Sequence, residues 1–97
     1  MRTKIQKLQL PVIFFKEGKQ IIAYTPALDL STFGKTLAEA QRRFGEVVEI
    51  FFEELVKMGT LEEVLQECGW EKHDNEFLPP TVISQGLTSV SVPLPIA

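Results

Sequence analysis

The side chains best suited to chemistry in this sequence are Cys68, His73 and Asp74, which lie in one short stretch. A thiolate, an imidazole and a carboxylate can all bind zinc, and an imidazole with a carboxylate can also perform acid–base chemistry. A structural zinc site needs four ligands, and this stretch offers no fourth one. Because Cys68 is the only cysteine, neither a cage of several thiolates nor an internal disulfide can form. We therefore interpret the stretch as part of a surface loop and expect no metal or other cofactor.

The remaining motifs of catalysis are missing from the sequence. It contains no glycine-rich phosphate loop, no nucleophile elbow and no cysteine–histidine pair at a suggestive spacing. We therefore predict that the protein is not an enzyme.

The charge and composition indicate one ordinary globular domain of 97 residues with a net charge of −3. Domains that bind nucleic acid through bulk electrostatics usually carry a basic excess, so the charge argues against this class. Nucleic-acid binding would require five basic residues to converge on one surface: Arg2, Lys4, Lys7, Arg42 and Arg43. No apolar run approaches the length of a membrane span, and we expect a cytoplasmic protein without a membrane partner.

The elements that must position any site are organised around a helix predicted over residues 36–59. Its apolar residues recur at steps of three and four and form one stripe facing a core. Thr36 can cap the first turn, with Glu39 reaching back to the Thr36 amide, and Gly59 can end the last turn. The opposite side carries Glu46, Glu49, Ile50, Glu53 and Glu54. These glutamates are either a solvated face or an acidic docking surface, and the apolar Ile50 among them is a candidate contact residue.

The segment ahead of this helix is predicted to form an antiparallel sheet. Alternating apolar residues predict strands over residues 5–15, 20–25 and 30–33, with a turn at Gly18 between the first two. Both faces of the first strand are apolar in its second half, so we expect that half to be covered on both sides.

After the long helix, Thr60 and Glu63 can form a second capping box for a short helix that ends at Gly69. Trp70 then follows, where it can close over the end of the core, and residues 71–76 are predicted to be a polar loop. Pro79 and Pro80 permit only an edge strand around them. The predicted fold class is α+β: a three-stranded antiparallel sheet plus later strand(s), packed on one long and one short helix in the order β-β-β-α-α-β.

We place a boundary near Ile83, between a core domain of residues 1–83 and an extended apolar tail of residues 84–97. In the tail, Val90, Val92, Leu94 and Ile96 alternate with serine and proline. Because a loose terminus is normally polar, we expect the tail to dock as a strand. It either closes the sheet of its own chain or adds to a partner, most simply in a homodimer or larger homo-oligomer.

Two stretches of the chain resemble the HicB family of antitoxins, over about residues 8–58. The family combines a Pro-x-Leu turn after a strand with a Gly-x-Thr-x-x-Glu-Ala helix start, which joins a strand end to a capping box. The matching residues here are Pro26, Leu28, Gly34, Thr36, Glu39 and Ala40. The segment over residues 59–70 also looks like that of small HicB-like proteins whose short helix ends in Gly-Trp.

This resemblance implies a partial ribonuclease-H-like fold and a binding function. HicB proteins neutralise a small ribonuclease toxin, HicA, by covering it. The alternative is an orphan oligomeric module of the same fold without a toxin partner. Many members also carry a DNA-binding domain, which this sequence lacks, and this argues against DNA binding. The ribonuclease-H-like fold does not imply a nuclease here, because the predicted strands carry no carboxylates to hold catalytic metal ions.

Overall fold

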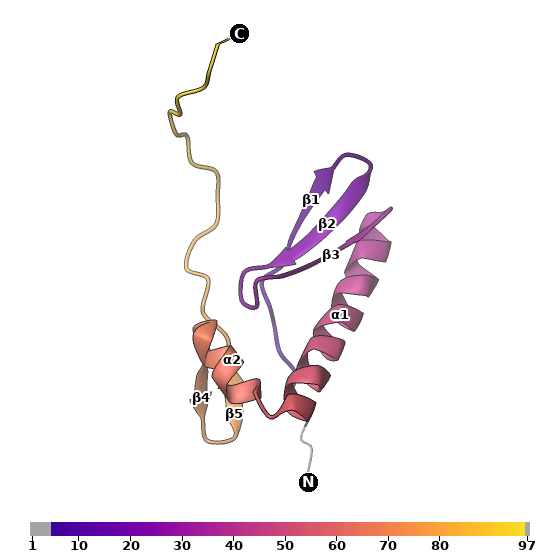
Figure 1. Cartoon of the computed structure of the whole chain (residues 1–97), viewed down its shortest axis with the longest axis vertical. Helices are drawn as coiled ribbons and strands as arrows, with labels where there is room; N and C mark the ends of the chain where they lie inside the picture. The colour runs from indigo at the N-terminus through magenta and orange to yellow at the C-terminus, as the bar shows by residue number, and fades with distance from the viewer. Residues whose placement is uncertain (1–4, 97) are drawn as a thin grey trace.

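The computed structural model describes residues 5–96 of the chain (Figure 1). Its elements in chain order are β1 (Ile13–Glu17), β2 (Gln20–Thr25), β3 (Leu30–Gly34), α1 (Leu37–Met58), α2 (Leu61–Glu67), β4 (Glu71–His73) and β5 (Glu76–Leu78). β1, β2 and β3 form one antiparallel sheet, and β4 and β5 form a second, two-stranded one. The predicted α+β fold, with three strands, a long helix, a short helix and later strands, is confirmed.

β2 lies at the centre of the three-stranded sheet, and β1 and β3 are its edges. The turn between β1 and β2 contains Gly18 at φ +62°, as predicted. The prediction of a strand from residue 5 is wrong, because strand pairing begins only at Ile13, opposite Tyr24. The reason is the length of β2, which ends at Thr25 ahead of Pro26, so residues before Ile13 have almost no strand to pair with.

One face of the sheet packs closely against α1 at Gly34. The register places Gly34 opposite Ile21, and a Cβ added to Gly34 would lie 2.6 Å from the backbone nitrogen of Ala40 in α1. Ala23, two residues after Ile21 and therefore on the same face, is completely buried, as is Ala40. The face that carries Ile21, Ala23 and Gly34 is therefore the face covered by α1.

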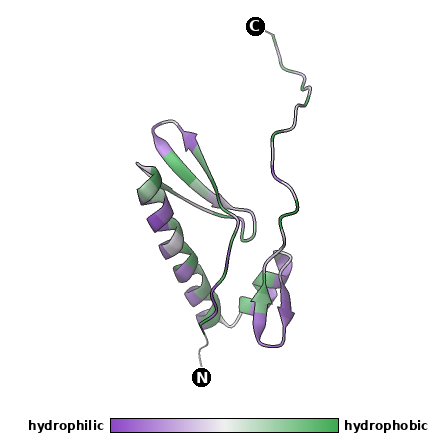
Figure 2. Ribbon diagram, turned by 180° about the vertical axis from the view of Figure 1, so that it is seen from behind, coloured by the Kyte–Doolittle hydropathy of each residue, from purple (hydrophilic) through white to green (hydrophobic). Residues whose placement is uncertain are grey.

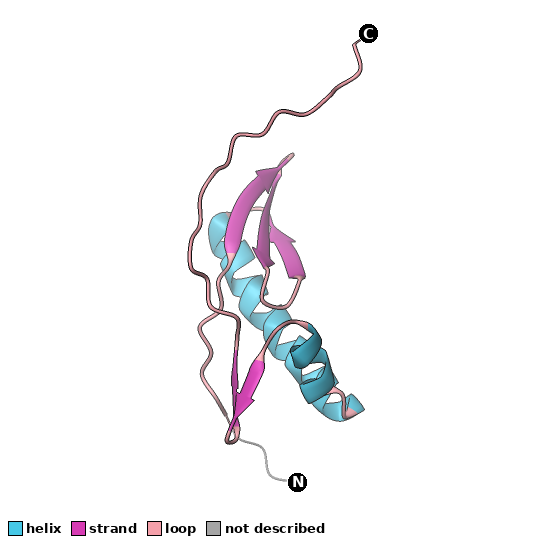
Figure 3. Ribbon diagram, turned by 90° about the vertical axis from the view of Figure 1, so that its left-hand side faces the viewer, coloured by secondary structure: helices cyan, strands magenta, loops and turns pink. Residues whose placement is uncertain are grey.

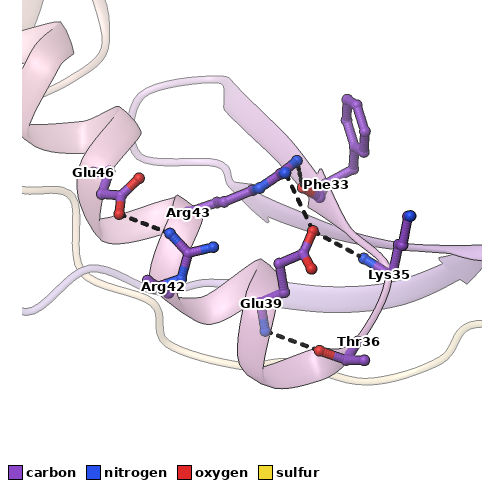
Figure 4. Close-up of polar contacts among 7 residues, drawn as sticks. All are labelled: Phe33, Lys35, Thr36, Glu39, Arg42, Arg43 and Glu46. Carbon is purple, nitrogen blue, oxygen red and sulfur yellow. Dashed lines mark hydrogen bonds and ion pairs between the residues drawn. The ribbon is translucent and has the colours of Figure 1, made fainter.

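The first turn of α1 is tied to β3 by polar contacts (Figure 4). Thr36 Oγ1 accepts a 3.1 Å hydrogen bond from the Glu39 amide, so the predicted cap is confirmed. The Glu39 carboxylate accepts a 3.4 Å hydrogen bond from the Lys35 amide, not from Thr36 as predicted, because it reaches one residue further back. Arg43 pairs with Glu39 at 3.3 Å and donates a 3.1 Å hydrogen bond to the Phe33 carbonyl oxygen.

The second predicted capping box, at Thr60, does not form. Gly59 ends α1 at φ +71° as predicted, but Thr60 has ψ 9° instead of the extended conformation of a capping residue. Its hydroxyl therefore makes no capping bond, and it is buried without a hydrogen-bond partner.

The predicted polar loop over residues 71–76 is also wrong, because β4 and β5 form a hairpin there. Its turn is Asp74 and Asn75, with Asp74 at φ +56°. Aspartate and asparagine tolerate the left-handed conformation that a two-residue hairpin turn requires. The segment is polar because most side chains of these two strands are exposed, so its composition gave no signal for strands.

The core lies between the two sheets and both helices. It contains Ala27, Leu28, Leu65 and Trp70, all buried, and the ring of Trp70 meets that of Phe52 edge-on at 6.0 Å. The indole Nε1 of Trp70 donates a 2.8 Å hydrogen bond to the Ala27 carbonyl oxygen. The prediction that Trp70 closes over the end of the core is therefore confirmed.

The extended segment ahead of β1 is fastened at its far end by Gln6. The amide of Gln6 donates a 2.8 Å hydrogen bond to the Phe77 carbonyl oxygen and accepts a 3.0 Å one from the Phe77 amide. This side chain therefore satisfies both backbone groups of one β5 residue. Leu8 and Leu10, further along the segment, pack on the core cluster.

The chain ends in a long projection beyond β5 (Figures 1 and 3). Residues 79–96 contain no strand, and all of them except Pro79 are exposed. The radius of gyration is 16.6 Å, whereas a compact chain of this length has about 12.5 Å. No helix in the described part of the chain is long and apolar enough to cross a membrane.

Candidate protein-binding surfaces

The side of the sheet that faces away from α1 forms an exposed apolar surface, which we call the outer face. Side chains alternate along each strand, so the outer face carries the residues between those that face α1. The register aligns them in two rows across the sheet: Ile13, Tyr24 and Ser31, and Phe15, Ile22 and Phe33. Ile13, Phe15 and Phe33 are 47%, 44% and 47% exposed. Figure 2 shows the apolar character of the strands beside the polar outer side of α1.

The prediction that both sides of β1 are covered is wrong for the outer face. α1 covers the opposite side of the sheet, and Ile13 and Phe15 of β1 remain about half exposed within the described chain. Sequence reasoning identified the apolar residues on both faces of this strand but predicted that both faces are covered. The signal for a binding surface was this excess of apolar residues on a short edge strand.

Polar groups border the outer face at two places. The guanidinium carbon of Arg43 lies 5.7 Å from the centre of the Phe33 ring, within the range of a cation–π contact. Tyr24 donates a 3.0 Å hydrogen bond to the Asp29 carboxylate, and this bond is the main reason that the pKa of Tyr24 is raised. An apolar centre with a polar rim is the usual anatomy of a protein-binding surface.

The tail presents the predicted interface residues to solvent. Val90, Val92, Leu94 and Ile96 are all exposed, between 61% for Val92 and 98% for Ile96. Within residues 5–96 the tail pairs with neither sheet, so the alternative in which it closes the sheet of its own chain is not the one observed. Addition to a partner stays a prediction.

Ile50, the fifth predicted interface residue, is 56% exposed in the middle of α1. Two neighbouring glutamates are partly neutralised, since Glu46 pairs with Arg42 at 3.0 Å and Glu54 with Lys57 at 3.9 Å. Figure 1 shows α1 and the tail on opposite sides of the sheet. The structure therefore does not bring Ile50 and the tail residues into one site.

The basic residues considered for nucleic-acid binding do not gather in the part of the chain that the structure describes. Arg2 and Lys4 lie outside the described residues. Lys7 follows Gln6, which is bonded to β5, whereas Arg42 and Arg43 lie in the first turns of α1 beside β3. Both arginines are also paired with glutamates.

The three candidate zinc ligands also stay apart. Cys68 lies at the end of α2, His73 lies in β4 and Asp74 lies in the hairpin turn. His73 Nε2 is 3.1 Å from a carboxylate oxygen of Glu71. Among residues 5–96, no three histidine, cysteine or carboxylate side chains are placed to hold one metal ion.

Comparison with known proteins finds no relative of this chain: no family model, no curated protein and no solved structure matches it. The candidate binding surfaces of the described chain are therefore the outer face and the tail.

Proposed function

We propose that this chain is a non-catalytic binding protein of the antitoxin type, which neutralises a small ribonuclease toxin by covering it. The observation that carries the proposal is the outer face, where Ile13 and Phe15 of β1 and Phe33 of β3 remain about half exposed on the two edge strands of one sheet. A folded domain this small gains by burying such residues, and each one contributes roughly 1.5–3 kcal/mol when it is fully buried. A protein partner that covers the outer face would supply that burial.

The class of partner follows from the resemblance to the HicB family. The residues of the family's helix start, from Gly34 to Ala40, lie where β3 passes into α1, and Gly34 allows the close contact between those two elements. A ribonuclease binds RNA phosphates and therefore carries a basic surface. The net charge of −3 favours association with such a surface.

The second candidate is the orphan oligomeric module, which has no toxin partner and associates only with copies of itself. The exposed apolar tail favours this candidate, because it offers an association surface that needs no second kind of protein.

Co-expression with the product of the neighbouring gene tests the proposal. If that gene encodes a small basic protein that arrests growth, we expect this chain to restore growth and to bind the protein directly. The Phe15→Glu variant should weaken the Kd at least about 30-fold, because it places an unpaired charge within the apolar outer face. The Ile50→Glu variant changes an exposed residue on the other side of the molecule in the same way and should bind normally.

The two variants separate the possible results. Loss of binding with Ile50→Glu but not with Phe15→Glu would move the contact to the outer side of α1 and overturn the assignment of the outer face. If the product of the neighbouring gene is not toxic and does not bind this chain, the antitoxin proposal is overturned and the orphan module is favoured. Circular dichroism of each variant confirms that it is folded.

A further inference from the structure

We propose that residues 89–96 of one copy pair, as an antiparallel strand, with the free edge of β1 in a second copy, so that two chains exchange their tails. This inference concerns the edge of the sheet and the tail, and it does not rest on the proposed function. Four observations lead to it: the positions of the prolines, the state of the two sheet edges, the course of the tail and the exposed area of the chain.

The prolines leave the tail with one edge that can pair. In a strand, the N–H and C=O groups of alternate residues point to the same side, so Val90, Val92 and Leu94 share one hydrogen-bonding edge. Pro93 and Pro95 belong to the other set, and proline has no N–H to donate. The tail can therefore pair along its valine–leucine edge, while its proline edge stops further strands from adding.

The free edge of β1 is the better acceptor in the three-stranded sheet. At the β3 edge, the Phe33 carbonyl oxygen already accepts a hydrogen bond from Arg43, and the chain turns at once into α1. At the β1 edge, no element of the described chain pairs with Ile13–Glu17 on the side away from β2. A two-residue turn closes on the hydrogen-bonded pair Glu17–Gln20, so the backbone groups of Phe14 and Lys16 face the free edge.

The course of the tail places its apolar end beyond the β1 of its own chain. Ser84, Gln85 and Gly86 line a shallow hollow together with Ile13, the first residue of β1. The tail and β1 then run in the same direction (Figures 1 and 3). Both advance about 3.3 Å per residue when extended, and β1 continues for four residues after Ile13, so the tail reaches the end of β1 at about residues 88–90 and Val92, Leu94 and Ile96 lie beyond it.

The tail cannot pair with β1 of its own chain, because its apolar end lies beyond that strand and runs parallel to it. A second copy removes both obstacles. A two-fold axis perpendicular to the strands turns the tail of the partner to run against β1, which gives antiparallel pairing and leaves both tails equivalent. Directly paired residues project to the same face, so Val90, Val92 and Leu94 would extend the apolar face that carries Phe14 and Ala23. The outer face stays open for a different partner.

The chain exposes more surface than a compact monomer of its mass, and the excess is large enough to form a dimer interface. The accessible surface is 8135 Å², whereas a compact monomer of 11.0 kDa exposes about 5,600 Å². The excess of roughly 2,500 Å² per chain exceeds what a standard stable interface buries in total, about 1,600 Å².

Proline substitution at two adjacent tail positions tests the pairing. Ser91 lies in the set whose N–H points away from β1, and Val92 lies in the set whose N–H points toward it. We expect the full chain to be a dimer by light scattering and sedimentation. Ser91→Pro should leave the dimer Kd within about threefold, whereas Val92→Pro should weaken it at least about tenfold, because it removes a ladder hydrogen bond twice per dimer.

Each result supports or overturns the proposal. A monomeric full chain overturns it, and so does a tail that becomes protected from hydrogen exchange only when the neighbouring gene product is added. If Ser91→Pro and Val92→Pro weaken the dimer equally, the tail associates without the proposed hydrogen-bonding register. If neither weakens the dimer, the dimer contact lies elsewhere. Because the outer face is separate, Val92→Pro should still rescue growth, so failure here is distinguishable from failure of the antitoxin proposal. Trp70 fluorescence confirms that each variant keeps its core.

Discussion

The indole of Trp70 is hydrogen-bonded to the carbonyl oxygen of Ala27 at 2.8 Å, in the buried core and across 43 positions of the chain. This bond joins the segment after α2 to the loop between β2 and β3. It also satisfies a backbone oxygen that would otherwise be buried without a donor.

Replacement of Trp70 by phenylalanine should therefore destabilise the protein by about 1–3 kcal/mol, because the Ala27 carbonyl loses its donor while most of the apolar contact is kept. Trp70→Ala should cost about 3–5 kcal/mol, since it also opens a cavity beside Phe52. Urea unfolding followed by circular dichroism measures both values. Fluorescence is unsuitable here, because Trp70 is the only tryptophan. Equal stability of Trp70→Phe and the unmodified protein would show that the bond contributes nothing.

Alanine at two glycines should change stability in opposite directions. Gly34→Ala would place a Cβ 2.6 Å from the Ala40 backbone nitrogen, so β3 and α1 must separate, and we expect a loss of at least about 2 kcal/mol. Gly45 lies inside α1 with nothing within 4 Å of the same position, so Gly45→Ala should add about 0.5–1 kcal/mol. Thermal unfolding of the two variants gives the comparison. A stable Gly34→Ala protein would mean that the sheet and α1 are not in close contact.

The two threonines ahead of the helices give a second matched pair. Thr36→Val removes the hydrogen bond that the Glu39 amide donates to the hydroxyl, and this should cost about 0.5–2 kcal/mol. Thr60→Val removes a buried hydroxyl that has no partner, so it should be neutral or stabilising by up to about 1 kcal/mol. The denaturant midpoints of the two variants show whether each substitution lowers or raises stability. A large loss with Thr60→Val would reveal a bond that the structure does not contain.

The pKa of Tyr24 should lie above the ordinary tyrosine value of about 10, first because of its hydrogen bond to Asp29. A raised pKa in the folded state favours the protonated phenol. Its contribution to stability is therefore complete below pH of about 10 and is lost as the pH rises through the folded-state pKa. Because Tyr24 is the only tyrosine, the ultraviolet absorbance of its phenolate reports this titration directly.

The control for this titration is Asp29→Asn, which removes the carboxylate that accepts the bond. Asparagine tolerates the φ of +49° found at Asp29, so the loop should keep its shape. The Tyr24 titration should then move to lower pH. An unchanged midpoint would assign the raised pKa to burial instead.

Local sequence signals predicted α1 well, because a few residues determine where the helix begins and ends. Thr36 and Gly59 specify the two ends, and the spacing of apolar residues specifies the face that packs on the sheet. The helix start that resembles the HicB motif includes Gly34, whose contact with Ala40 explains why no larger residue fits there. A capping box alone was not sufficient, however, because Thr60 has a similar pattern but the backbone after Gly59 does not take the required conformation.

What the sequence did not predict depends on pairing between distant segments. The limit of β1 is set by the length of β2, and the exposure of Phe15 is set by the side of the sheet on which α1 packs. The β4–β5 hairpin is stabilised by contacts such as that between Gln6 and Phe77 and not by apolar alternation of its own. The tail residues were singled out by their alternation, but a strand that pairs with them cannot be read from that pattern.

The bond between Gln6 and Phe77 also has a consequence for biosynthesis. Its two residues are 71 positions apart, whereas β1, β2, β3 and α1 follow one another without interruption. During synthesis the three-stranded sheet and α1 are therefore complete early, but Gln6 cannot form its hydrogen bonds to Phe77 until β5 has been made. A stalled or shortened product that ends within α2 would carry the sheet and α1 but lack Trp70, so the core cluster on which Leu8 and Leu10 pack would be incomplete. Such products are natural targets for chaperones and proteases.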